Sequence, residues 1–424
     1  MVIHLLPKQK TRVRFSSPAQ KTMKFLSSLN RKDLQNKTCL LRVDFNIKDS
    51  ELDKNNLRIR AVLPTIKFLI DNGAKVVILS HRGRPDKKCQ ISNIERQKLT
   101  LKPFAEILSS LLKKPVHFID FKKEKKFDAA QISKTITRDS IFLLENLRFF
   151  DGEEKNDKNF AKQLASFGDF YVNDAFSVSH RKNASVVAIT EFLSSYAGLL
   201  LEKEIKNFSS VMNPFDKTQD SRRVYRGVKN PKKPLVIILG GAKISDKIGV
   251  IKNFFKIADY FLIGGGMANT FLAAQGLPVG DSLFEKKAMP VARKFLKFKS
   301  IILPVDTAVY KKQILDIGPE TIEKYSKIIK NARTIIWNGP MGYIEDKKFR
   351  KGSEAIAKAI INNKKAFSII GGGETTSIVS GIKCQVSGNI FISTGGGAML
   401  EYLAGKKLPG IEALNNITNC KNKR

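Results

Sequence analysis

From residue 23 onward, short uninterrupted runs of apolar and β-branched residues alternate with stretches in which apolar residues recur every three or four positions. Strands that are apolar at every position, rather than at alternate positions, indicate sheets that are covered on both faces. Their alternation with helices predicts parallel β-α-β units. The clearest runs lie at residues 75–80, 140–144, 170–172, 235–239, 260–263, 301–303, 334–337, 367–370 and 390–393.

One helix is clearly marked, at residues 61–72. Val62, Ile66 and Leu69 share one face of this helix, which predicts that the face is buried. Pro64 lies in the first turn, where the missing N–H costs nothing because that group has no intrahelical partner.

The whole pattern predicts an α/β protein with two Rossmann-like lobes, each a parallel sheet covered by helices, joined by a hinge helix. A charged amphipathic segment at 199–208 supplies the hinge helix. We place the first lobe at 23–196 and the second at 197–405. Residues 213–233 are polar, rich in basic side chains and without an apolar period, which predicts a long exposed loop inserted in the second lobe.

Residues 1–22 differ from the rest of the chain. They carry basic residues and no acidic residue, a composition that resembles an organellar transit peptide. However, Pro7 and Pro18 interrupt any amphipathic helix. We therefore favour a disordered extension, with Met23 as the working start of the folded protein.

The chain of 424 residues has 75 Lys and Arg against 39 Asp and Glu, a formal net charge of +36. Such a charge could serve to bind nucleic acid, a membrane surface or anionic metabolites. However, the lysines are spread along the chain rather than clustered, which favours a compositional bias as the origin of the charge. No stretch approaches the ~18 uncharged apolar residues of a membrane-spanning helix. The cysteines are far apart, which argues against a zinc ribbon or redox pair and favours a reducing cytoplasm.

The second half places glycine-rich turns directly after predicted strands, at 240–243, 264–266, 371–373 and 395–397. Glycine allows the backbone to approach an anion closely, and the helix that follows offers unpaired N–H groups. Four such turns in one lobe predict a phosphate-binding crevice at the carboxyl edge of a parallel sheet. Lys243 and Lys247 are four residues apart, so both could face the crevice from one helix start.

Two common nucleotide motifs are absent. The sequence contains no G-x-x-x-x-G-K-[ST], which excludes a P-loop. No G-x-G-x-x-G follows the first strand with an acidic residue about twenty positions later, which argues against an NAD-dependent dehydrogenase.

The first half has basic residues in the loops that follow its strands: Arg42, Arg58, His81, Arg82, Arg84, Arg148, His180 and Arg181. Arginine is suited to a bidentate grip on phosphate or carboxylate. A cationic first lobe facing a glycine-lined second lobe suggests an anionic substrate on one side and a nucleotide on the other. Closure of the lobes would bring the two together.

These segments, in this order, resemble the signature blocks of the phosphoglycerate kinase family. The resemblance covers residues 23–417 and rests on RVDFN (42–46), HRGRP (81–85), LLENLRF (143–149), YVNDAF (171–176), LGGAKISDK (239–247), IGGGMANTF (263–271), WNGPMG (337–342), GGGET (371–375) and STGGGA (393–398).

The resemblance implies a monomeric, cytosolic hinge enzyme that moves the acyl phosphate of 1,3-bisphosphoglycerate to ADP, giving ATP and 3-phosphoglycerate. It implies that residues 406–424 return to the first lobe. By motif match, the phosphoglycerate would be held by Asp44, Asn46, Arg58, His81, Arg84, Arg148 and Arg181. The nucleotide would be held by Lys243, Lys247, Glu345, Gly372, Gly373, Glu374 and Thr375, with Glu374 reaching Mg²⁺ through the Mg-nucleotide. Gly395 and Gly396 would offer amides to the transferring group, beside Arg58 and Lys243 as catalytic cations.

The chemistry of phosphoryl transfer agrees with this set. It needs positioning and neutralisation of charge on the phosphate oxygens rather than a covalent nucleophile. Arg58, Lys243 and glycine amides can supply positive charge once the lobes exclude water. We assign no nucleophile, and we interpret Asp44 as a residue that orients Arg58 or substrate hydroxyls.

Four departures from the family pattern stand out. Residues 173–181 read NDAFSVSHR where NDAFGTAHR is typical, Glu374 replaces the usual Asp, and 213–233 is an insertion. Residues 305–320 are much shorter than the corresponding family segment, which helps to form the nucleoside pocket; whether a working pocket remains is left open. A decayed or moonlighting basic protein that binds nucleic acid or other polyanions is the alternative, although we do not expect nucleic acid as a partner.

Overall fold

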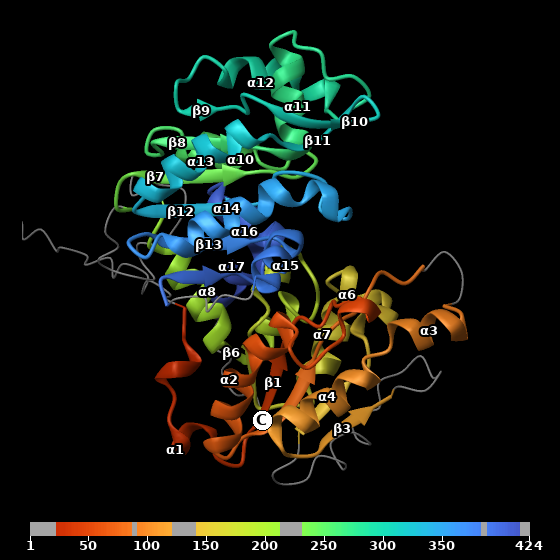
Figure 1. Cartoon of the computed structure of the whole chain (residues 1–424). Helices are drawn as coiled ribbons and strands as arrows, with labels where there is room; N and C mark the ends of the chain where they lie inside the picture. Colours follow the sequence, from red (N-terminus) through yellow and green to blue (C-terminus); the bar gives the residue numbers. More distant parts are fainter. Residues whose placement is uncertain (1–22, 87–90, 121–140, 213–230, 383–387, 416–424) are drawn as a thin grey trace, which may run out of the picture.

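The computed structural model describes residues 23–86, 91–120, 141–212, 231–382 and 388–415. Within these ranges the chain forms two lobes, which lie one above the other in Figure 1, each built on a six-stranded sheet. The α/β class with two parallel sheets is therefore confirmed. The predicted extension at 1–22 and most of the predicted insertion at 213–233 lie outside the described residues.

The first lobe contains a sheet in the order β3-β4-β2-β1-β5-β6, in which every pair is parallel. Its strands are β1 (Thr38–Arg42), β2 (Lys75–Leu79), β3 (Val116–Ile119), β4 (Ile141–Leu144), β5 (Phe170–Asn173) and β6 (Ser194–Ala197). Its helices are α1 (Arg31–Leu34), α2 (Leu57–Asp71), α3 (Asn93–Leu99), α4 (Lys102–Leu112), α6 (Asp151–Glu154) and α7 (Lys158–Ala165), with 3-10 turns η1 (Leu26–Ser28), η2 (Asp49–Glu51), η3 (Leu147–Phe149), η4 (Phe176–Val178) and η5 (Ala188–Glu191).

The second lobe contains a parallel sheet in the order β14-β13-β12-β7-β8-β9 and a separate antiparallel hairpin, β10-β11. Its strands are β7 (Leu235–Leu239), β8 (Tyr260–Ile263), β9 (Ile301–Ile302), β10 (Thr307–Tyr310), β11 (Gln313–Ile317), β12 (Thr334–Asn338), β13 (Phe367–Gly371) and β14 (Ile390–Ile392). Its helices are α10 (Ile248–Phe254), α11 (Gly265–Ala274), α12 (Met289–Phe295), α13 (Pro319–Asn331), α14 (Lys351–Asn362), α15 (Gly373–Gly381) and α16 (Gly396–Leu403), with turns η6 (Lys286–Ala288) and η7 (Lys347–Phe349).

The uninterrupted apolar strands are buried on both faces, as the sequence pattern predicts. On adjacent strands of the first sheet, Leu40 and Val77 belong to one hydrophobic core, whereas Leu41 and Ile78 belong to another. Every residue of β7 is buried in the second sheet. Burial of both faces requires a helical layer on each side.

The helix predicted at 61–72 is confirmed in type but begins earlier, as α2 at Leu57. The Asn56 side chain accepts a hydrogen bond from the Arg58 N–H at 2.9 Å and caps the helix there. Pro64 therefore lies inside the helix rather than in its first turn. The earlier start adds a turn that contains Arg58, which matters for the site below.

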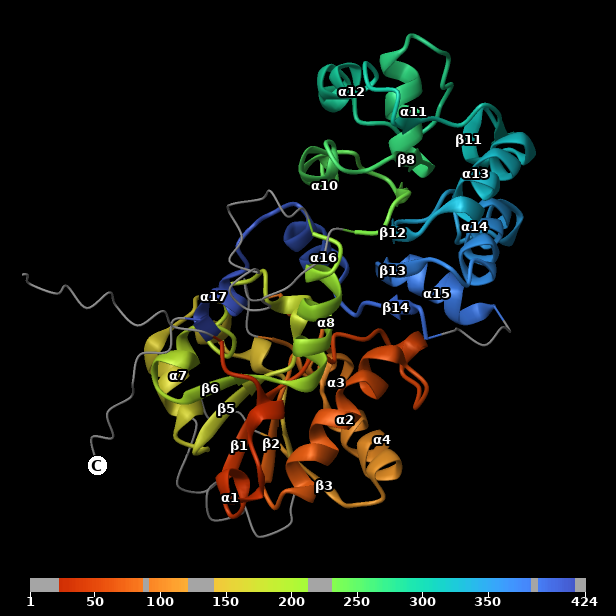
Figure 2. The same ribbon diagram turned by 90° about the vertical axis from the view of Figure 1, so that its left-hand side faces the viewer.

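Two segments connect the lobes. Helix α8 (Leu199–Ser209) lies between them in Figure 2, and α17 (Pro409–Asn415) lies beside the first lobe. The Gly410 N–H donates to the Ser179 carbonyl at 2.8 Å. The predicted domain boundaries at 196 and 405 stay predictions. Within the described residues, no helix is long and apolar enough to span a membrane.

Candidate active site

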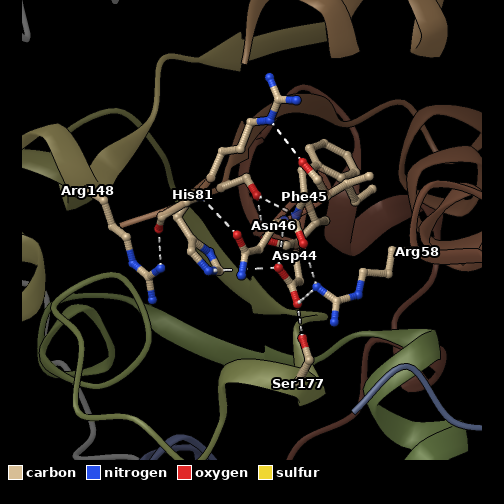
Figure 3. Close-up of polar contacts among 12 residues, drawn as sticks. Asp44, Phe45, Asn46, Arg58, His81, Arg148 and Ser177 are labelled. Atoms are coloured by element: carbon tan, nitrogen blue, oxygen red, sulfur yellow. Dashed lines mark hydrogen bonds and ion pairs between the residues drawn. The ribbon is translucent and has the colours of Figure 1, made fainter. Parts of the chain in front are cut away.

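The carboxyl edge of the first sheet carries an ion pair between a buried aspartate and a half-buried arginine. Asp44 follows β1, and its Oδ2 accepts a hydrogen bond from Arg58 Nη1 of α2 at 2.9 Å (Figure 3). Arg58 also donates to the Asn46 carbonyl at 2.9 Å, and the Asn46 N–H donates to Asp44 Oδ1 at 2.9 Å. Burial is the largest single influence on Asp44 and raises its pKa, but Arg58 and His81 and the hydrogen bonds from Ser177 and Asn46 together outweigh it, so the pKa lies well below the usual range and Asp44 is ionised.

His81 follows β2 and lies beside this pair, with its Nε2 3.9 Å from Asp44 Oδ1. On the other side of the ring, Arg42 Nη2 lies 3.0 Å from Nδ1. Since a guanidinium can only donate, Nδ1 is the acceptor and Nε2 carries the proton. Burial lowers the pKa of His81 well below its ordinary value, and Arg42, Arg148 and Arg181 add to the effect while Asp44 opposes it. His81 is therefore a neutral donor.

The remaining first-lobe residues differ in placement. Arg148 in η3 is buried, donates to the Gly83 carbonyl and has its pKa lowered by burial to about 10. The Asn46 side chain accepts from the Gly83 N–H at 2.9 Å. Arg181 is half-buried, close enough to influence His81, whereas Arg84 is exposed and does not line the cleft cavity. The structure thus brings Asp44, Asn46, Arg58, His81, Arg148 and Arg181 together and leaves Arg84 at the margin.

A cavity of about 1170 Å³ lies between the two lobes. Asn46, Arg58 and Arg82 line it from the first lobe. The second lobe contributes Lys243, Lys247, the glycine turn with Glu374 and Thr375, and Thr394. A basic surface therefore faces the glycine turns across one continuous space, as predicted from the strand-end loops.

The glycines of the second lobe fall into two groups. A Cβ at Gly240, Gly265 or Gly339 would overlap neighbouring backbone atoms, so these glycines are explained by close packing of the turns. A Cβ at Gly373 or Gly397 would meet nothing within 4 Å. These open glycines lie in the first turns of α15 and α16, whose first N–H groups lack intrahelical acceptors and suit an anion.

The flanking glycines are more constrained. Gly372 has φ 103°, which favours glycine, and a Cβ at Gly396 would contact Gly372 at 3.4 Å. Gly395 is packed against the Phe176 ring of the first lobe. The loops that precede α15 and α16 therefore lie against each other, and one of them touches the opposite lobe.

The two lysines are arranged differently from the prediction. The helix begins at Ile248, so Lys243 and Lys247 precede it and do not share its first turn. Lys247 is buried, and a Cβ on Gly241 would lie 3.6 Å from its Nζ. Burial lowers the pKa of Lys247, while Asp246, Glu374 and Glu285 oppose this. Lys243 is exposed and lines the cleft.

Glu374 is exposed at the start of α15, whereas Thr375 is buried, with its hydroxyl accepting from the Gly339 N–H at 2.8 Å. Among the described residues, no group of three or more His, Cys, Asp or Glu could hold a metal ion. A single carboxylate fits Mg²⁺ that arrives with a nucleotide, because Mg²⁺ is commonly bound through one or two carboxylates plus substrate phosphates.

The short segment at 305–320 forms the β10-β11 hairpin and lines a second cavity of about 600 Å³. The hairpin is tied to both walls of this cavity: Ile314 N–H donates to Ser282 Oγ at 2.8 Å, and Tyr343 N–H donates to the Leu315 carbonyl at 2.7 Å. The cavity also borders Gly241, Gly266 and Glu345. A pocket of nucleoside size thus persists despite the shorter segment.

Sequence reasoning did not assign roles to several residues at the site. Ser177 donates to Asp44, Arg42 orients His81, and Asn338 donates to the Gly371 carbonyl at 3.1 Å. Each follows the carboxyl end of a strand or ends one, and that position was the available signal. Their partners come from distant parts of the chain, so the contacts themselves could not be inferred.

Two parallel-sheet lobes with a basic site facing a glycine-lined one define a two-lobed phosphotransferase. A family model described as phosphoglycerate kinase matches residues 29–406. The chain is 42% identical over 411 residues to phosphoglycerate kinase of Staphylococcus haemolyticus (strain JCSC1435) and 42% identical over 413 residues to that of Staphylococcus aureus (strain JH9), in each case covering 91% of this chain and 98% of the relative.

Solved structures agree. Phosphoglycerate kinase from Coxiella burnetii matches with a TM-score of 0.72 at 34% identity, and that from Pyrococcus horikoshii OT3 with 0.75 at 33% identity; each match covers 92% of this chain and 98% of the other. The chain belongs to the phosphoglycerate kinase family. It is a kinase, and the alternative of a nonenzymatic basic binding protein is not favoured.

Proposed function

We propose that this chain catalyses the reversible transfer of the acyl phosphate of 1,3-bisphosphoglycerate to ADP, giving ATP and 3-phosphoglycerate, a step of glycolysis. The observation that carries the proposal is the cavity between the lobes. On one side it has Arg58, which is paired with Asp44 behind it, and on the other it has Lys247 and the open glycine turn at the start of α15.

The first lobe would hold the phosphoglycerate. Arg58 presents a guanidinium that is anchored through Nη1 alone in the hydrogen bonds found among the described residues, which leaves its other nitrogens for an anion. Neutral His81 is buried behind this arginine and would offer its Nε2 proton to a substrate oxygen that reaches it. Asn46, Arg148 and Arg181 surround them, and Arg84 is retained as a residue that would reach the substrate from the margin.

The second lobe would hold the nucleotide. The cavity bordered by the β10-β11 hairpin and Glu345 would take the nucleoside, and Lys243, Lys247 and the 372–375 turn would take the phosphates. Glu374 would hold Mg²⁺ bound to the nucleotide, which supplies positive charge beside the transferring phosphate. Gly396 would donate its amide to that phosphate, and Gly395 would do so once its N–H leaves the Ser393 hydroxyl, to which it donates at 3.1 Å in this structure. Arg58 and Lys243 would be the neighbouring cations.

We further propose a monomeric, cytoplasmic enzyme without a nucleic-acid partner. Salt-titrated binding to generic DNA would reveal a polyanion-binding role as a steep loss of affinity with salt.

The test is a coupled assay. Purified protein is incubated with 3-phosphoglycerate and Mg-ATP, and formation of the acyl phosphate is coupled to NADH oxidation, for the full chain and for one that starts at Met23. We expect turnover from both. Absence of turnover at every magnesium concentration would refute the proposed reaction.

A further inference from the structure

The hydroxyl of Ser177 makes a contact that the family's usual glycine cannot make. Ser177 lies in η4, after β5, and its Oγ donates a hydrogen bond to Asp44 Oδ2 (Figure 3). The same oxygen accepts from Arg58 at 2.9 Å. One carboxylate oxygen therefore links a serine of one loop to an arginine of α2.

These contacts fix the Asp44 carboxylate through both of its oxygens. Oδ2 accepts from Arg58 and Ser177, and Oδ1 accepts from the Asn46 N–H at 2.9 Å. An ionised carboxylate oxygen has about two acceptor sites, so Oδ2 is saturated. The remaining site, on Oδ1, is the one that a substrate hydroxyl could use.

The saturation of Asp44 Oδ2 matters because Arg58 would have two anionic partners, Asp44 and the substrate phosphate. The Arg58 side chain is 29% exposed and lines the cleft, so its remaining nitrogens can bind a substrate phosphate, and the pull of that phosphate would loosen the bond from Nη1 to Asp44. An O–H···O⁻ bond from a serine is strong and is not drawn away by the phosphate. Ser177 therefore keeps Asp44 in place while the charge of Arg58 is drawn toward the transferring group.

Ser177 also lies where the lobes meet. Asp44, Arg58, Ser177 and Thr394 surround one small cavity of about 10 Å³. A Cβ on Gly395 would lie 3.5 Å from the Ser177 Cα. The turn that orients Asp44 thus packs on the second-lobe loop that contains Gly395.

We propose that Ser177 is a positioning residue for phosphoryl transfer: its hydroxyl fixes Asp44, and through Asp44 it orients Arg58 against the second-lobe loop at Gly395. This inference rests on the roles proposed for Asp44 and Arg58. It does not make Ser177 a residue that touches substrate.

The experiment is a double-mutant cycle on the full chain, with Ser177→Ala, Arg58→Ala and the combined variant. We expect Ser177→Ala to lower kcat about fivefold to tenfold and to raise KM for 3-phosphoglycerate about threefold, since a hydrogen bond to a charged group is lost. KM for ATP should stay unchanged. In the Arg58→Ala background, Ser177→Ala should have no further effect on kcat, because its action passes through Arg58.

Two further variants complete the design. Ser177→Thr retains the hydroxyl and should recover most of kcat. Ser179→Ala is the matched control, because Ser179 belongs to the same loop but donates to the Ala175 carbonyl at 3.2 Å, and it should leave kinetics unchanged. Should Ser177→Ala fail to fold, Ser177→Gly, which restores the family's residue, takes its place in the cycle.

The inference is overturned by wild-type kinetics in the hydroxyl-free variant, or by kcat losses that are additive with Arg58→Ala. A purely structural role would lower the melting temperature without the selective rise in KM for 3-phosphoglycerate, and that result also overturns it. An inactive wild-type protein would instead refute the proposed reaction, so the two failures are distinguishable.

Discussion

Glu204 of the hinge helix α8 accepts hydrogen bonds from both the backbone N–H and the hydroxyl of Thr394, at 2.7 and 2.9 Å. The two residues are 190 positions apart, and both are buried. Thr394 directly precedes Gly395. A single carboxylate oxygen on the helix between the lobes therefore holds the loop that leads into α16.

This contact predicts a pH-dependent stability. Burial raises the pKa of Glu204 from 4.5 to about 7, although the bonds from Thr394 oppose the shift. As pH rises from about 4.5 to 7, Glu204 loses its proton in the unfolded chain before it does so in the folded chain. The free energy of unfolding of the wild type should therefore fall over this range, by roughly 3 kcal/mol at most, whereas that of Glu204→Gln lacks this contribution. Urea unfolding of both proteins between pH 5 and 8 measures it. A constant difference across this range contradicts the prediction.

Replacement of Arg58 should remove transition-state stabilisation. We expect Arg58→Ala to lower kcat about a thousandfold, in the range of cationic groups that act on a transferring phosphate. Arg60→Ala is the control, because Arg60 lies on the same helix but is exposed and binds Lys54 and Asn55 instead. Steady-state kinetics of both variants decide the matter, and an unchanged kcat in Arg58→Ala would mean that its role is misassigned.

Lys247 should contribute mainly to nucleotide affinity. Its ammonium is buried beside the Gly240–Gly241 turn, so Lys247→Ala should weaken ADP binding by about tenfold or more, the value of a hydrogen bond to a charged group. Lys252→Ala, an exposed lysine of α10, should bind ADP normally. Calorimetry with ADP is the measurement. Equal affinities for the two variants would exclude a phosphate contact by Lys247.

The packed and the open glycines of the second lobe should differ in how much an alanine substitution changes the free energy of unfolding. In Gly240→Ala the added Cβ would overlap the Pro340 carbonyl oxygen, and this backbone atom cannot move aside cheaply, so we expect a loss of about 3 kcal/mol. Gly397→Ala has open space and should change stability by less than about 1 kcal/mol. Denaturant unfolding compares them. If a ligand approaches the backbone at Gly397, Gly397→Ala should lower kcat or raise KM even though its stability hardly changes.

Most buried strands were predictable from sequence because burial on both faces leaves an uninterrupted apolar run, but β1 and β3 were not among the predicted runs: β1 has Thr38 and Arg42 at its two ends, and β3 contains His117. β7 and β8 match the predicted ranges, whereas β6 was missed: it is an edge strand with two half-buried residues, so its sequence SSYA carries no such run. The hairpin β10-β11 was missed for a related reason, since much of it is exposed.

Site residues were predictable where motif and strand end coincide. The carboxyl ends of parallel strands meet at one edge, which brings Asp44, His81 and Arg148 together from different strands and loops. The local backbone at Lys243 and Lys247 was not predictable from their spacing, because glycine turns packed against Gly339 delay the start of α10. The Ser177–Asp44 bond spans 133 positions and is visible only in three dimensions.

The position of α17, the last described helix, has a consequence for co-translational folding. α17 is bonded to the carbonyl of Ser179, and its Leu414 is buried, so the turn that carries Ser177 packs against a helix that follows the second sheet in the chain. During synthesis on a ribosome the strands of the first sheet emerge before α17 does, but the turn that carries Ser177 reaches its final packing only after α17 has emerged.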